Sequence, residues 1–157
     1  MKKTFTILFL LCTASIFSQT KKITEEWIEA KYNEFERVNS LSNTMDLYFE
    51  DNYLYYEYLN AFFKVKIKDI KEIEFKKERF SNKDKEGWIS LCIRMDDGKL
   101  FYKEANDTGF TKSTETAFKI PFSAEIKEDD YHKRMEKAIV HLVKLNGGNA
   151  KVKREPF

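Results

Sequence analysis

Apolar and polar residues alternate along most of the chain between residues 44 and 122, and this two-residue period constrains the fold more than any other feature. Turn-forming runs such as Asp51-Asn52 and Asp96-Asp97-Gly98 interrupt the alternation and predict hairpins. The pattern therefore predicts about seven short antiparallel strands. The expected strand segments are 44–50, 53–59, 63–68, 72–76, 88–95, 99–104 and 118–122.

Two segments with a helical period flank the predicted strands. Residues 24–38 begin with a threonine N-cap, and residues 128–145 form a longer amphipathic helix that an Asn-Gly-Gly sequence ends. The apolar stripe of this second helix consists of Tyr131, Met135, Ala138, Ile139, Leu142 and Leu145. The sequence thus predicts a single α+β domain over residues 20–148, followed by a loose polar tail over residues 149–157.

The first 19 residues have the layout of a secretory signal peptide. Two lysines precede an apolar run that ends at Phe17, and this run is shorter than the roughly 20 apolar residues of a membrane-spanning helix. Leucine precedes Cys12, where lipoprotein processing requires a small residue. We therefore expect cleavage near Gln19 and export to the periplasm or the exterior, with no membrane insertion afterwards. An uncleaved anchor is the alternative.

The charge of the chain depends on whether this signal is removed. The full chain has 28 Lys+Arg and 26 Asp+Glu, and two of the lysines precede Gln19, so the mature chain is close to neutral. A neutral domain has no overall field that attracts nucleic acid, and we expect no nucleic-acid partner. Because Cys12 leaves with the signal, Cys92 has no intrachain cysteine with which to form a disulfide.

The order of the predicted elements is similar to the pleckstrin-homology-like superfold, including GRAM-type domains, in which seven strands precede a closing helix. Residues 65–73 resemble the middle strands of such domains, and residues 137–145 with Glu155-Pro156-Phe157 resemble the end of many exported bacterial proteins. The signal ending Phe17-Ser18-Gln19 resembles signals of flavobacteria and their relatives. The resemblance implies a bent antiparallel barrel plugged by the C-terminal helix. The segment 24–38 has no counterpart in it.

Side chains that carry chemistry are few and scattered. His132 and His141 are nine residues apart on one predicted helix, so they project from opposite sides and cannot share a metal ion. Cys92 lies on a predicted strand, and the chain has no glycine-rich phosphate loop and no nucleophile elbow. We expect no catalytic, cofactor or metal site. A hydrolase that assembles scattered acids around His132 is an alternative.

Lys64, Lys66 and Lys68 form a one-sided basic stripe on a predicted strand. Three glutamates follow on the next predicted strand, over residues 72–78, and cross-strand ion pairing between the two strands accounts for both sets. A lipid-binding site at the first hairpin is disfavoured, because that hairpin carries Glu50 and Asp51, which repel acidic head groups.

A cluster of tyrosines crowds the first predicted hairpin, and not all of its members can face one core: Tyr48, Tyr53, Tyr55, Tyr56 and Tyr58. One interpretation is that the helix 24–38 covers the second face. The other is that an exposed aromatic strip binds another exported protein or a glycan, since tyrosine is enriched at interfaces. The first function hypothesis is a non-catalytic exported binding module. A hydrolase and a small-ligand carrier that uses the barrel interior are the alternatives.

Overall fold

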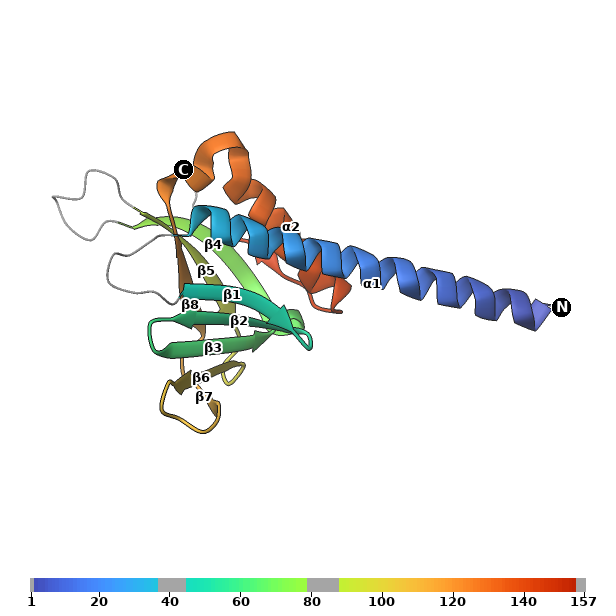
Figure 1. Ribbon diagram of the computed structural model, residues 1–157, viewed down its shortest axis with the longest axis horizontal. Helices are drawn as coiled ribbons and strands as arrows, with labels where there is room; N and C mark the ends of the chain where they lie inside the picture. Colours follow the sequence, from blue (N-terminus) through green and yellow to red (C-terminus); the bar gives the residue numbers. More distant parts are fainter. Residues whose placement is uncertain (1, 37–44, 79–87, 155–157) are drawn as a thin grey trace.

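The computed structural model describes residues 2–36, 45–78 and 88–154. Within these residues the chain forms two helices and nine strands, which confirms the α+β class (Figure 1). Two of the nine strands are only two residues long and were not expected: β7, Thr111–Lys112, and β9, Lys151–Val152. Segment 37–38 of the first expected helix and residue 44 of the first expected strand lie outside the described residues.

The strands form two separate sheets rather than one closed barrel. The first sheet has the order β1-β2-β3-β6-β7, with every neighbouring pair antiparallel. Its longer members are β1, Met45–Glu50; β2, Tyr53–Tyr58; β3, Ala61–Lys66; and β6, Leu100–Glu104. The second sheet has the order β8-β5-β4-β9, formed by β4, Ile70–Glu78; β5, Trp88–Met95; and β8, Ala117–Phe122, with β9 parallel to β4. The strands of the two sheets cross steeply (Figure 1).

Of the two hairpins expected from turn sequences, one is present and the other is not. Asp51 and Asn52 both have positive φ, 49° and 66°, and they join β1 to β2 as predicted. Asp96-Asp97-Gly98 also forms a turn, with Gly98 at φ 68°, but it does not close a hairpin. It connects β5 of the second sheet to β6 of the first, because β5 pairs with β4 and β8 while β6 pairs with β3 and β7.

The helix expected over residues 24–38 is the C-terminal part of a longer helix, α1, Lys2–Phe35. Its C-terminal part lies between β1 of the first sheet and β8 of the second. The carboxylate of Glu29 accepts a hydrogen bond from the backbone N–H of Phe49 on β1, at 2.9 Å, and Phe35 O accepts one from Ser123 N just after β8, at 2.8 Å. The helix therefore covers the open side between the two sheets.

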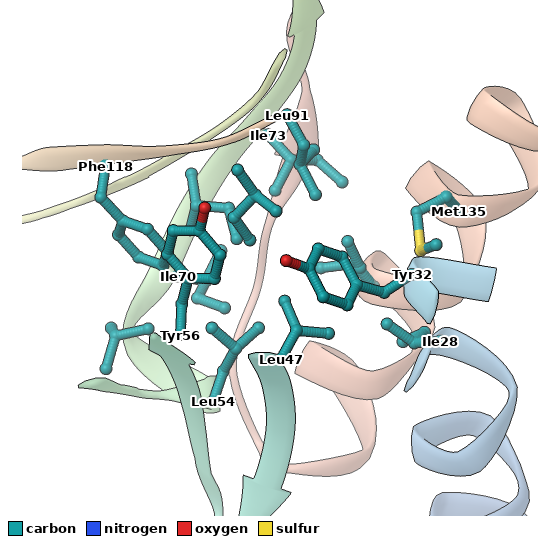
Figure 2. Close-up of a cluster of buried hydrophobic side chains, with 14 of the residues drawn as sticks. Ile28, Tyr32, Leu47, Leu54, Tyr56, Ile70, Ile73, Leu91, Phe118 and Met135 are labelled. Atoms are coloured by element: carbon teal, nitrogen blue, oxygen red, sulfur yellow. The ribbon is translucent and has the colours of Figure 1, made fainter. Parts of the chain in front are cut away.

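The core lies between the inner faces of the two sheets and both helices (Figure 2). Tyr32 of α1 is fully buried, and its ring makes edge contacts with Tyr56 of β2 at 6.3 Å and with Phe122 of β8 at 5.6 Å. Ile28 lies one turn earlier on the same side of α1. One helix face thus joins side chains from both sheets.

Helix α2, Tyr131–Leu145, follows a 3₁₀ segment, η2, Ala124–Asp130. It begins three residues later than expected and buries Met135, Ile139, Leu142 and Val143. It ends in a Schellman motif, in which Gly147 at φ 79° donates to Lys144 O and Gly148 donates to Val143 O. The chain then returns as β9, so residues 151–152 of the expected loose tail are paired with β4.

Candidate functional site

Strand register divides the tyrosine cluster between the two faces of the first sheet. Tyr56 and Tyr58 lie on the inner face with Leu54, and Tyr56 is 2% exposed. Tyr48, Tyr53 and Tyr55 lie on the outer face and are half-buried. The hairpin therefore contributes to the core with one face and to the surface with the other.

The outward rings are packed against one another. Tyr48 and Tyr55 are directly opposite across β1 and β2, and their rings stack in parallel with centroids 4.9 Å apart. Tyr55 also contacts Tyr53 at 6.1 Å and Phe110 at 6.2 Å. Partial burial raises the pKa of both Tyr48 and Tyr55, so these phenols stay protonated at neutral pH.

Lysines from β3 and β6 lie among these rings. The Lys64 ammonium is 4.2 Å from the Phe110 centroid, 5.2 Å from that of Tyr53 and 5.7 Å from that of Phe101. Lys103 lies 4.7 Å from the Phe62 centroid. These distances fit cation–π contacts. We call the whole set the tyrosine–lysine face: Tyr48, Tyr53, Tyr55, Phe62, Lys64, Lys66, Phe101, Lys103 and Phe110.

Neither helix covers the tyrosine–lysine face. The aromatic contact that α1 makes with the first sheet is between Tyr32 and inward-facing Tyr56, and both helices lie away from β6 and β7 (Figure 1). The helices approach the face at its edge, where Lys21 of α1 lines a pocket with Tyr53 and Lys66. The interpretation in which the helix 24–38 hides the second face of the hairpin is therefore wrong. Phe62, Phe101 and Phe110 were missed in the sequence, although the alternation along β3 placed Phe62 opposite in direction to Phe63 and Val65.

The basic stripe on β3 does not pair with the glutamates of β4. The two strands belong to different sheets, and the chain passes between them through a 3₁₀ turn, η1, Ile67–Asp69. The glutamates of β4 instead pair within the second sheet: Glu74 with Lys76 at 3.2 Å, and Glu72 with Arg94 at 3.4 Å. The expected cross-strand pairing was wrong because it assumed that consecutive strands are neighbours.

A pocket of about 520 Å³ adjoins the tyrosine–lysine face at the β1–β2 turn. It shares Tyr53 and Lys66 with that face, and its other lining residues are Lys21, Asp51, Asn52, Lys68, Leu145 and Asn146. Lys21 of α1 donates to the side-chain oxygen of Asn52 and lies 3.7 Å from Glu25. The pocket lies where α1, η1 and the end of α2 meet, outside the packed core.

The structure separates the candidate reactive residues. Cys92 lies on the outer face of β5, opposite Glu74 of β4, and it is buried; burial raises the pKa of its thiol. His132 lies on the other side of this sheet, where its ring meets the inward-facing Phe75 at 6.1 Å. Burial, with help from Lys133, lowers the pKa of His132. These residues do not form one constellation.

Neither a metal cluster nor a membrane-spanning helix is found among the described residues. No group of three or more His, Cys, Asp or Glu side chains among the described residues is arranged to hold a metal ion. No helix in residues 2–36 or 88–154 combines the length and apolar character needed to cross a membrane. No protein-family model, curated protein or solved structure matches the chain.

Proposed function

We propose that the chain is a non-catalytic binding module and that the tyrosine–lysine face binds another protein. The observation that carries the proposal is a contiguous set of six aromatic and three lysine side chains on a sheet face that neither helix covers. Aromatic residues are enriched in protein interfaces, and tyrosine adds a polar tip to a large apolar ring. The six aromatic side chains are half-buried, and contiguous apolar clusters that stay partly open to solvent mark interaction sites.

The ring geometry favours a protein over a glycan. A sugar ring needs an aromatic ring whose flat face is open. Here the Tyr48 and Tyr55 rings face each other, at an interplanar angle of 1°, and Lys64 lies over Tyr53 and Phe110. Each of these rings therefore has one flat face occupied, and the set combines rings, phenol hydroxyls and ammonium groups, which suits the mixed surface of a protein.

The two alternative functions have less support. A hydrolase built around His132 lacks a nucleophile there, because Cys92 and His132 lie on opposite sides of the second sheet, and the neighbouring acid Asp130 is paired with Lys133 at 2.9 Å. A carrier needs an open interior, but side chains such as Tyr32, Tyr56 and Phe118 fill the space between the sheets (Figure 2).

We also infer that the chain works outside the cytoplasm after cleavage near Gln19. The course of α1 supports this, because Lys21 donates to Asn52 of the β1–β2 turn, while the helix before that point projects from the body (Figure 1). Relation to the pleckstrin-homology-like superfold is part of the same proposal, supported by a long amphipathic helix after the antiparallel strands.

Photo-crosslinking tests the binding proposal. A photoreactive phenylalanine analogue replaces Tyr55 on the tyrosine–lysine face or, as a control, exposed Lys137 on α2, in the cells that make the protein. We expect a defined protein adduct from position 55 and none from position 137. Absence of an adduct at position 55, with the variant folded and exported, would rule out this face as the binding surface.

A further inference from the structure

We propose that the protein bound by the tyrosine–lysine face is a second copy of this chain, packed face to face about a two-fold axis that runs between β2 and β3, parallel to both. This inference rests on the proposed function and names its partner. It follows from the distribution of charge over the outer face of the first sheet.

Charges on this outer face are divided by strand. The acids lie on β1 and β2, as Asp46, Glu50 and Glu57, and the lysines lie on β3, β6 and β7, as Lys64, Lys66, Lys103 and Lys112. None of these seven side chains forms an ion pair with another residue of the described chain. The second sheet differs, since Glu72 and Glu74 there are paired with Arg94, Lys151 and Lys76.

A two-fold axis along the strands brings these unlike charges together. The rotation places β2 of one copy over β3 of the other, and β1 of one copy over β6 of the other. The acidic half of each copy therefore lies over the basic half of its partner. Antiparallel register places Asp46, Glu57, Phe62 and Lys103 in one row across the sheet. Rotation therefore sets Asp46 of one copy opposite Lys103 of the other, and the reverse, as an isologous interface requires.

The aromatic residues match under the same rotation. The next row across the sheet contains Tyr48, Tyr55, Lys64 and Phe101. Tyr48 then lies opposite Phe101 of the second copy, and Tyr55 lies opposite Lys64, which are ring–ring and ring–cation pairs. Two sheets stacked with nearly parallel strands, crossing at about 30°, are a common packing arrangement.

The other face-to-face arrangement is unfavourable. An axis perpendicular to the strands, along the row of Tyr48 and Lys64, would stack β1 on β1 and β3 on β3, which sets Asp46 of one copy opposite Glu50 of the other and Lys64 opposite Lys64. Like charges so placed repel, so the charge pattern selects the axis along the strands. A purely acidic partner would leave Asp46, Glu50 and Glu57 facing like charges.

The size of the face limits the area that the dimer can bury. Six-residue strands span about 20 Å, and four strands spaced about 4.8 Å apart cover a similar width, so the face projects about 400 Å². Stable interfaces bury about 800 Å² per partner, so a face of about half that area lies below the standard size and suits a weak or transient contact. We expect a weak, reversible dimer that salt further weakens.

Sedimentation equilibrium of the protein purified after export tests the proposal. Lys103→Glu places two acids opposite each other, and Asp46→Lys places two lysines opposite each other, so each change should raise the dimer Kd about tenfold or more. The double variant Asp46→Lys/Lys103→Glu exchanges the charges and should restore dimerisation. Lys137→Glu on α2 is the matched control and should leave the Kd unchanged, while urea melts confirm that all four variants fold.

The outcomes separate this inference from the proposed function. A monomer at every concentration, or a dimer that Lys103→Glu leaves intact, would overturn the face-to-face dimer. A different protein attached at position 55 in the crosslinking experiment would overturn it too, while supporting the binding module. No adduct at position 55 would overturn both.

Discussion

Tyr32 is the residue on which the junction of the two sheets depends. Its ring touches Tyr56 of the first sheet and Phe122 of the second, and its hydroxyl points toward that of Tyr56 (Figure 2). Neither hydroxyl has a hydrogen-bond partner within the described residues. Burial raises the pKa of both phenols far above neutral pH. The rings therefore stabilise the core, whereas the oxygens contribute little.

Two substitutions at Tyr32 separate these contributions. Tyr32→Phe keeps the ring and removes a buried hydroxyl without a partner, so the free energy of unfolding should stay within about 1 kcal/mol or rise. Tyr32→Ala removes the ring and should cost about 3–5 kcal/mol. Urea melts measure both. A Phe variant that loses as much stability as the Ala variant would show that the hydroxyl is essential.

At the scale of the elements, the sequence predicted strands and turns, which depend on neighbouring residues, and missed the contacts between residues far apart in the chain. Alternation predicted β1 to β3 and their Asp51-Asn52 turn, because strand period and turn chemistry act over a few residues. It could not predict that Asp96-Asp97-Gly98 joins two sheets, since a turn does not specify which strands pair. The place of α1 also depends on contacts between residues far apart in sequence, such as Glu29 with Phe49.

The junction between α2 and β9 provides an element-scale prediction. A Cβ on Gly148 would lie 2.7 Å from Lys68 Cα and 2.7 Å from Val143 Cγ1, closer than atoms pack, whereas a Cβ on Gly109 would meet open space. Gly148→Ala should therefore lower the free energy of unfolding by about 1–3 kcal/mol, and Gly109→Ala should not. Chemical denaturation of both variants is the measurement, and equal stabilities would contradict the close contact.

His132 lies outside the apolar stripe predicted for α2, but it is half-buried and its Nδ1 atom lacks a partner within the described chain. Its folded pKa is lowered by burial, so the unfolded chain binds the proton more readily. Stability should therefore be full above pH of about 6.5 and fall as the pH drops below it. His132→Gln should flatten this fall, and exposed His141→Gln should not. Identical profiles for the wild type and His132→Gln would show that His132 does not contribute.

At the scale of the whole molecule, the two sheets differ in how the charges on their outer faces are arranged. On the second sheet the outward Glu72 and Glu74 are paired with basic side chains, whereas the outward lysines of the first sheet lie among aromatic rings. The sequence indicated the tyrosine cluster as a candidate but named two members, Tyr56 and Tyr58, that face the core. The lysines and phenylalanines of the face come from β3, β6 and the segment before β7, and only tertiary pairing brings them together.

Truncation tests how much of α1 the folded body needs. A chain that begins at Thr20, the proposed mature start, keeps Lys21, Ile28 and Tyr32, so it should unfold cooperatively. A chain that begins at Asn33 loses two buried side chains and should lose about 4–10 kcal/mol, which exceeds the stability of many domains. An intact Met1 in the mass spectrum of protein found outside the cytoplasm would contradict cleavage near Gln19. A stable chain beginning at Asn33 would contradict the need for Ile28 and Tyr32.

Lysine labelling of the protein in its native surroundings tests most directly whether the tyrosine–lysine face is a binding surface. Lys66 and Lys103 lie on the face, and Lys127 and Lys137 are exposed elsewhere. Labelling with an amine-reactive reagent is compared by mass spectrometry between the native fraction of the cells that make the protein and the purified protein at high dilution. We predict that Lys66 and Lys103 are protected several-fold in the native fraction while Lys127 and Lys137 react equally in both. Equal labelling of all four lysines in both samples would contradict the account.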